Sequence, residues 1–476
     1  MSPGSKLQAV LQTLKPAGSY VLTEALFLRL LGLVYLAAFG SLWPQLPGLI
    51  GSSGIAPVTQ TLTGMRAAFG AKAFFYVPSL FWFATGWTNS DVALTLCCAL
   101  GCLGSMLLLA GFFPRYAAAA CFILYLSLST VGQPFTSFQW DALLLETGFL
   151  ALFSGASWLV WAYRFLLFRL MFESGLVKLA SHDPNWRNLH ALRYHFLTQP
   201  LPNPIAYYVH RAPDWLLDSF TGATLSIELI CPFLLFCPKR VRRAGVGLLM
   251  LLQVAIILTG NYAFFNLLTL ALCLWAWDDA TFAPLEQLLR RGFPLSLLPR
   301  SKLTARTWNA ALAVLALFGA LQIAGIQPTW LQPFEIVNHY GLFAVMTTTR
   351  PEIVIEGSDD RATWREYSFS YKPGDLHRGL PFIAPYQPRL DWQMWFAALG
   401  SYRESPWLQG LMYRLLRGDP SVLALLDPPP FSKPPRYIRA KLYMYDFSTP
   451  GERRRSGAVW RRELLGNWFG PVSLKE

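Results

Sequence analysis

Long apolar runs separated by short polar loops recur over the first two thirds of the chain. A helix needs about 20 apolar residues to cross the hydrocarbon core of a bilayer, whereas a barrel strand would show strict alternation. We therefore predict a polytopic α-helical membrane bundle with about nine spans. The shorter segment 73–86 contains Pro78 and is typical of a re-entrant or interfacial piece. The expected spans cover approximately residues 22–40, 91–113, 116–132, 138–153, 157–177, 216–236, 244–260, 262–277 and 308–326.

The pattern changes after residue 327, where charged residues become frequent and no further run of membrane length follows. Turn residues at 357–360 separate two short β-branched and aromatic runs, and this arrangement predicts a β-hairpin. We therefore divide the chain into the helical bundle, residues 1–326, and a small soluble α+β domain, residues 327–476. The expected elements of that domain are strands at 352–356, 364–371 and 437–447, helices at 391–400 and 406–417, and an extended connector at 427–435.

The composition agrees with a membrane protein, because 54% of the residues are hydrophobic and only 14% are charged, against about 25% charged in soluble domains. The net charge is +13, and much of it lies in loops that share one face if the spans alternate. By the positive-inside rule that face is cytoplasmic, so we expect the C-terminal domain outside the cytoplasm and no nucleic-acid binding. The basic loop residues are Lys6, Lys15, Lys239, Arg240, Arg242, Arg243, Arg290, Arg291, Arg300, Lys302 and Arg306.

Two acids, Asp141 and Glu146, lie inside the otherwise apolar stretch 137–153, where a charge is costly unless it is paired. The turn between the fourth and fifth spans is centred near Gly155, and residues equally far from a turn lie at equal depth in an antiparallel hairpin. The ordinary role of such pairs is to hold two helices together, and the alternative is a polar floor beneath a site in the bundle. The expected network pairs Asp141 with Arg169 and Glu146 with Arg164, and Glu173 extends it by one helical turn from Arg169.

Lys178 lies at the end of the fifth span, where a lysine ordinarily extends its ammonium group to the membrane surface. The sharper alternative is a partly desolvated lysine with a lowered pKa that acts as a base. The loop that follows is rich in histidine, but the histidine spacing matches no compact ligand motif, so we expect no metal site. The histidines of this region are His182, His190, His195 and His210.

Several motifs in collinear order resemble the lipase maturation factor family, at 138–146, 186–189, 194–204, 371–375 and 384–396. The resemblance implies a multi-pass protein of the endoplasmic reticulum membrane in eukaryotes, with its C-terminal domain in the lumen. It also implies a chaperone-like role in the folding and assembly of secreted lipases, with such a client and membrane lipid as partners. The C-terminal domain here has no cysteine and no glycosylation sequon, so we expect a bacterial relative in the inner membrane with a periplasmic domain.

The motif residues of this resemblance are our candidates for contact with a client. For the last motif we also expect a plain structural role, with Trp392, Trp395 and Phe396 in the core at helical spacing. Arg389 and Asp391 are then surface or ion-pair residues, and neither is expected to be catalytic. The candidates are Gln139, Trp140, Trp186, Tyr194, His195, Arg389 and Asp391.

A second resemblance covers only the bundle. Residues 174–179, Ser-Gly-Leu-Val-Lys-Leu, followed by Trp186, are similar to a segment of vitamin K-dependent γ-glutamyl carboxylases. Lys178 falls on the lysine that serves as the base in that family, while Val177 replaces the preceding lysine. The resemblance implies an enzyme that removes a proton from a quinol, an apolar substrate that resides in the membrane.

Three hypotheses result from the sequence. The favoured one is a membrane-bound maturation factor that needs no cofactor and binds a secreted client through its C-terminal domain. The alternative is a membrane enzyme that uses Lys178 on a lipid-soluble substrate, with a quinone as the possible cofactor. A transporter is the third, but it would preferably show two related halves, and the sequence shows no such duplication.

Overall fold

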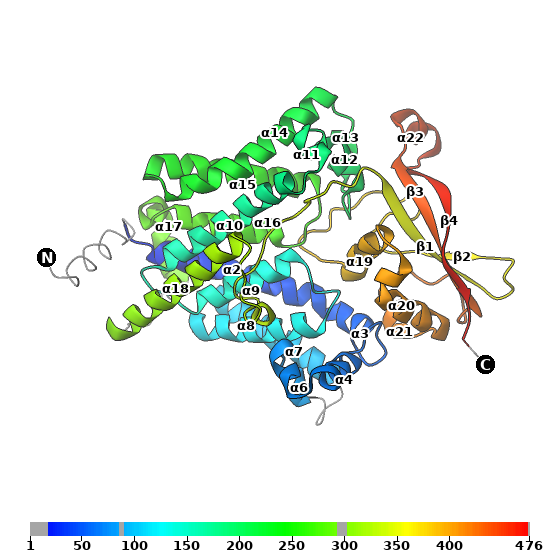
Figure 1. The fold of residues 1–476 in the computed structure, drawn as a ribbon, viewed down its shortest axis with the longest axis horizontal. Helices are drawn as coiled ribbons and strands as arrows, with labels where there is room; N and C mark the ends of the chain where they lie inside the picture. The colour runs from blue at the N-terminus through cyan, green and yellow to red at the C-terminus, as the bar shows by residue number, and fades with distance from the viewer. Residues whose placement is uncertain (1–17, 85–89, 293–301, 475–476) are drawn as a thin grey trace.

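The computed structural model describes residues 18–84, 90–292 and 302–474 (Figure 1). Three of the expected basic loop residues, Lys6, Lys15 and Arg300, lie outside this described part. The helices of the bundle are α2 (Val21–Leu42), α3 (Leu46–Leu49), α4 (Val58–Phe69), α5 (Ala73–Tyr76), α6 (Phe81–Ala84), α7 (Ser90–Ala110), α8 (Pro114–Val131), α9 (Gln139–Ala151), α10 (Leu159–Ala180), α11 (Pro184–Arg187), α12 (Ala191–Thr198), α13 (Pro204–Val209), α14 (Asp214–Ile230), α15 (Lys239–Thr259), α16 (Phe265–Cys273), α17 (Asp279–Gly292) and α18 (Lys302–Ile323).

Each of the nine expected spans coincides with a helix, and six helical segments of the described chain are long and apolar enough to cross a membrane. The other three expected spans fall short for different reasons: α9 has 13 residues, α16 has nine, and α10 carries four charged side chains. A total of nine crossings therefore stays a prediction. The six segments are Val21–Leu49, Ser90–Ala110, Pro114–Val131, Asp214–Phe236, Lys239–Thr259 and Ala305–Ile323.

The C-terminal domain is a four-stranded antiparallel sheet in the order β2-β1-β3-β4, with α19 packed against β1. The predicted hairpin, the third strand and both helices are present, although the second hairpin strand is only three residues long. The sequence analysis missed the edge strand β4, because two glycines and a proline interrupt it and its apolar and polar residues do not alternate. The elements are β1 (Arg350–Ser358), β2 (Arg365–Tyr367), α19 (Arg389–Ala398), α20 (Pro406–Arg417), α21 (Pro420–Leu423), β3 (Tyr437–Phe447), α22 (Pro450–Ser456) and β4 (Trp460–Val472).

One hydrophobic core runs from the bundle into the sheet domain. It includes Leu143 of α9, Trp392 of α19 and Ile353 of β1, and the rings of Trp140 and Trp392 meet edge to face with centroids 4.8 Å apart. Residues 327–349, called here the return segment, run from α18 back across α9 and α10 to reach β1 (Figure 1). The sheet domain is therefore packed into the bundle rather than tethered to it.

The two ends of the bundle differ in chemistry. At one end, Asp279 accepts hydrogen bonds from the first backbone N–H groups of α2 at 2.8 to 3.0 Å. Its neighbour Asp278 pairs with Lys239 at the start of α15 (Oδ2 to Nζ, 2.8 Å), and we call this the basic end. Beyond the other end of α2, the side chain of Gln45 accepts a hydrogen bond from the backbone N–H of Arg389 at 2.8 Å. We call that the sheet end.

Candidate functional site

Asp141 is the bundle half of a buried ion pair with the sheet domain. The guanidinium of Arg389 donates from Nη1 to Oδ2 of Asp141 at 2.7 Å and from Nη2 to Oδ1 at 2.9 Å. Arg389 also donates to the carbonyl of Phe135 at 2.9 Å and to the hydroxyl of Tyr125 at 3.1 Å, and Tyr125 donates in turn to Asp141. Both charged side chains are at most 1% exposed. The bidentate geometry and the extra hydrogen bonds are what a buried pair needs to offset its desolvation cost.

Glu146 holds the return segment through a second buried network. It pairs with Arg169 of α10 (Nη1 to Oε1, 2.9 Å; Nη2 to Oε2, 3.1 Å). Its Oε2 also accepts hydrogen bonds from the backbone N–H of Asn338 and the hydroxyl of Tyr340, both at 2.9 Å. Arg169 in turn donates to the carbonyl of Asn338 at 2.6 Å, and Glu173 accepts from the backbone N–H of Tyr340 at 2.8 Å. The network therefore fixes backbone as well as side chains.

The predicted partners in this network were wrong, although the predicted contact between Arg169 and Glu173 is present at 3.6 Å. Glu146 pairs with Arg169 rather than Arg164, because α10 begins only at Leu159 and the turn is longer than its assumed centre implied. Arg164 instead donates to the carbonyl of Trp275 and the hydroxyl of Tyr20, both at 2.8 Å. Asp141 is thereby free to pair with a residue 248 positions along the chain.

Burial decides against most of the expected client contacts. Four of the seven candidates are buried and cannot touch a client without rearrangement, and Gln139 uses its side-chain oxygen to accept from the backbone of the return segment at 3.1 Å. The buried carboxylate of Asp391 accepts hydrogen bonds from the backbone N–H groups of residues 371 and 372, so it has a role within the sheet domain. The expectation for Phe396 was also wrong, since 46% of it is exposed on the outer face of α19. The four buried candidates are Trp140, Trp186, Arg389 and Asp391, while Tyr194 and His195 are half-buried.

The predicted site residue Lys178 borders a cavity of about 500 Å³ between α10, α12, α14, α15 and α16. Its ammonium group bonds both oxygens of Glu228 on α14, at 2.7 and 2.8 Å, and the carbonyl of Ser174 at 3.1 Å. Trp186 covers it from the other side, with the ring centroid 5.2 Å from Nζ. The side chain of Lys178 is buried and ion-paired rather than exposed, and Glu228 is a partner that the sequence analysis missed.

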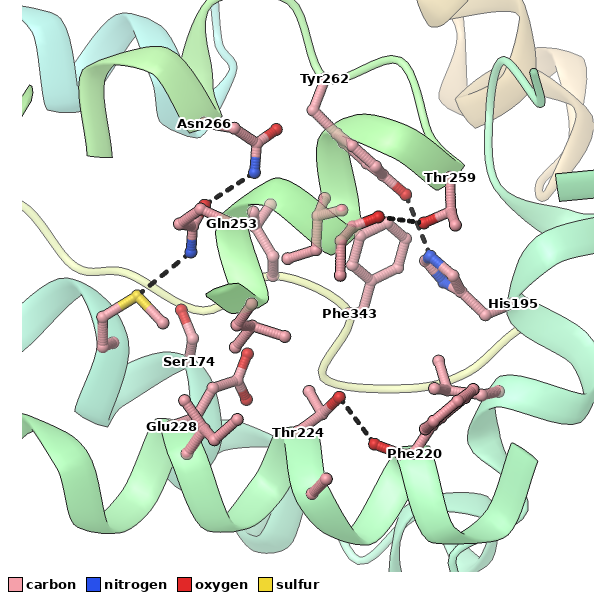
Figure 2. A pocket seen from close by; sticks show the side chains of 18 of the residues that line it. Ser174, His195, Phe220, Thr224, Glu228, Gln253, Thr259, Tyr262, Asn266 and Phe343 are labelled. Atoms are coloured by element: carbon pink, nitrogen blue, oxygen red, sulfur yellow. Dashed lines mark hydrogen bonds between the residues drawn. The ribbon is translucent and has the colours of Figure 1, made fainter. Parts of the chain in front are cut away.

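Uncharged polar groups line the cavity at the sheet end (Figure 2). The hydroxyl of Tyr262 lies 3.2 Å from Nε2 of His195 and donates to Gln199 at 3.2 Å. On the opposite wall, Asn266 donates to the side chain of Gln253 at 2.7 Å. Burial, together with the nearby charge of Lys178, lowers the pKa of His195 to about 4, so this imidazole is neutral at physiological pH.

No group of three histidine, cysteine or acidic side chains in the described part of the chain is arranged to hold a metal ion. All seven cysteines lie in that part and are free thiols. The cavity therefore offers a paired ion, several neutral hydrogen-bonding groups and a mostly aliphatic wall. Such a lining suits the recognition of a lipid-soluble molecule.

The fold and these sites define an integral membrane protein whose helical bundle and C-terminal domain are joined through buried ion pairs. Two family models match it: the lipase maturation factor transmembrane domain over residues 22–284 and the lipase maturation factor C-terminal domain over residues 336–470. The chain belongs to the lipase maturation factor family.

Similarity to individual members extends over nearly the whole chain. Lipase maturation factor 1 of Bos taurus is 35% identical over 97% of this chain and 90% of the relative. Lipase maturation factor 2 of Mus musculus is 35% identical over 95% of this chain and 83% of the relative. No solved structure matches the chain. These findings give no support to the resemblance to carboxylases or to a bacterial source.

Proposed function

We propose that this chain is a membrane-bound maturation factor that assists the folding and assembly of secreted lipases. The observation that carries the proposal is identity of about 35% across both domains to proteins named lipase maturation factors. The fold is compatible with such a role, because the sheet domain is packed against one end of the bundle, while its edge strand β4 lies at the outer side of the sheet in the described part of the chain. We expect the bundle to act as anchor and the sheet domain to meet the client.

We further propose that the sheet domain lies in the lumen of the endoplasmic reticulum, or in the periplasm of a bacterium. The basic end would be cytoplasmic by the positive-inside rule, and the sheet end is opposite to it. The chain starts α2 at the basic end, and Asn309 of α18 accepts a hydrogen bond there from the backbone of Trp158 at 3.2 Å. Further along α18, Gly319 lies against Arg169, so the helix runs toward the sheet end. An odd number of crossings is needed, and nine satisfies this condition.

The edge strand β4 is the part of the sheet domain that we assign to the client. It is 13 residues long. Among the described residues it pairs with β3 alone, along one of its two edges. Leu464 and Leu465 are 49% and 51% exposed. An unpaired edge can accept an added strand from a partner, because its free N–H and C=O groups offer a ready ladder. A client protein that has not finished folding has strands whose backbone N–H and C=O groups are still unpaired.

The test is secretion of active lipase from cells that lack their own maturation factors. Expression of this chain is expected to restore secreted activity, and the paired change Leu464→Asp with Leu465→Asp is expected to reduce it at least fivefold at equal protein level. Tyr413→Asp, at a residue of similar exposure on α20, is the matched control. No restoration by the unchanged chain would overturn the function. Restoration that the β4 changes leave intact would overturn only the assignment of the edge strand.

A further inference from the structure

The cavity beside Lys178 opens sideways between two peripheral helices. Its lining includes Phe220 and Ala223 of α14 and Leu251 and Ala255 of α15, all of them exposed on the outside of the bundle. Only a third of the apolar window of each helix is buried against other helices, so their outer faces meet lipid. The opening therefore connects the cavity with the hydrocarbon of the bilayer rather than with water.

The cavity changes in polarity along its length. The neutral hydrogen-bonding groups of His195, Tyr262 and Thr259 gather at the sheet end, where α15 finishes and α12 lies. Deeper in the bundle most of the wall is formed by aliphatic and aromatic side chains such as Leu170 and Leu252, and the polar side chains there, Gln253 and Asn266, bond each other at 2.7 Å. The polarity of the cavity wall changes in the same direction as that of a lipid in the adjacent leaflet. Such a lipid places its polar head near the membrane surface and its alkyl chain toward the centre.

The charge of the lining limits what the head of such a lipid can be. Within the described chain, Lys178 and Glu228 are the charged residues of the lining, and they neutralise each other through two short hydrogen bonds. An anionic head would therefore meet no free cation, and a cationic head would meet no free anion. Burial of an unpaired charge is costly, so an uncharged head that accepts and donates hydrogen bonds fits the site best.

We propose that this cavity binds one uncharged lipid with a single long alkyl chain and a hydrogen-bonding head, of the chemical class of the monoacylglycerols. The volume of about 500 Å³ lies within the usual range for sites that bury a small organic ligand. The head bonds to the His195 and Tyr262 end, and the chain lies between α14 and α15. This proposal does not depend on the function proposed above, because the cavity is lined by the bundle and by Leu342 and Phe343 of the return segment, and not by β4.

The experiment uses the purified full chain in phosphatidylcholine vesicles with a photoreactive monoacylglycerol probe. We expect labelling on α14, α15 or α16, at least tenfold stronger than labelling by the fatty acid probe of equal chain length. Ala255→Trp fills the opening and is expected to reduce labelling at least fivefold. Val254→Trp places the same ring one residue away, on an exposed position that does not line the cavity, and is expected to leave labelling unchanged.

A second pair of variants, on α14, tests the same cavity in case Ala255→Trp on α15 impairs folding. Thr224→Trp enters the cavity from α14, whereas Ser226→Trp points outward on the same helix. Equal labelling of all four variants would overturn the site, and equal labelling by the fatty acid would overturn the uncharged head. Competition by a prenylquinone, with no competition by unlabelled monoacylglycerol, would overturn the glyceride class.

Discussion

Two of the buried charge clusters in the bundle, those around Asp141 and Lys178, have different roles. The Asp141 cluster takes its basic partner from the sheet domain, and further hydrogen bonds from Arg389 to Phe135 and Tyr125 surround its fully buried ions. The Lys178 cluster takes its acidic partner from the neighbouring helix α14, and it borders a cavity of about 500 Å³. Buried charge by itself therefore does not mark a ligand site. Two features distinguish an ion pair that joins two domains, called here the joint, from one that borders a binding site. They are the position of the partner residue and the presence of an empty volume beside the pair.

The two clusters should also differ in what their loss does to the fold. The joint around Asp141 connects two parts of the chain, so its loss is expected to loosen the sheet domain as well as lower stability. The pair beside the cavity connects α10 with α14 inside the bundle. Its loss is expected to change the cavity and to leave the sheet domain in place.

The largest effect is expected from Arg389→Ala, which leaves Asp141 buried without its partner. Removal of one member of a buried pair costs about 3–5 kcal/mol, so we expect a clear drop in unfolding temperature and early proteolysis of the sheet domain. Thermal unfolding in detergent and limited proteolysis measure both. Arg361→Ala, at an exposed arginine, is the control. A sheet domain that stays resistant to protease would show that the joint does not hold it.

A smaller effect is expected in a double-mutant cycle on Glu146. Contacting residues couple by about 0.5–3 kcal/mol, so Glu146→Gln and Arg169→Gln should together cost less than the sum of the two single changes. Glu146→Gln and Arg164→Gln should simply add, because Arg164 lies at the basic end with other partners. The free energy of unfolding of each variant gives both cycles. Coupling to Arg164 instead of Arg169 would contradict the pairing.

These two predictions show how far the sequence could lead. Hydropathy predicted a helix at each of the nine expected spans, and the structure has one at each. A long apolar run in a membrane has few alternatives to a helix. Hydropathy could not pair Asp141 with Arg389, since nothing local indicates a contact between residues 248 positions apart. The hairpin argument gave both acids the wrong partners, because it assumed a turn that was too short. The one usable signal was that both residues lie in motifs of the same family.

The cavity could not be predicted from the sequence, for a different reason. Lys178 was singled out for its place at the end of a span, but a cavity is a property of how several helices diverge. Glu228 lies in the expected span 216–236, and its pairing with Lys178 depends on the side-by-side packing of α10 and α14. Periodicity reports which face of a helix is buried and does not report whether the space against that face is filled.

The return segment offers a pH test of the buried charges around Asp141 and Glu146. Burial and the nearby charges of Asp141 and Glu146 raise the pKa of Glu335 to about 7. Because this carboxyl binds its proton more tightly in the folded state, the free energy of unfolding falls as pH rises from about 4.5 to about 7. Glu335→Gln is expected to raise stability by about 1–2 kcal/mol at pH 7.5 and to change little at pH 4.5. Equal effects in unfolding measurements at the two pH values would contradict this assignment.

The smallest effect on stability is expected from replacing both members of the second cluster, Lys178→Met with Glu228→Met. Apolar replacement of a whole buried pair is often neutral, so we expect a change within about 1 kcal/mol and a sheet domain as resistant to protease as in the unchanged chain. The single change Glu228→Met should lower the free energy of unfolding more than the double change, because it leaves the ammonium group of Lys178 buried without its acidic partner. If the double variant unfolded like Arg389→Ala, the two clusters would be equivalent joints and the contrast between them would be wrong. If it kept its fold but lost all lipase secretion, Lys178 would need a role beyond its ion pair, and the hypothesis of a reactive lysine would regain weight.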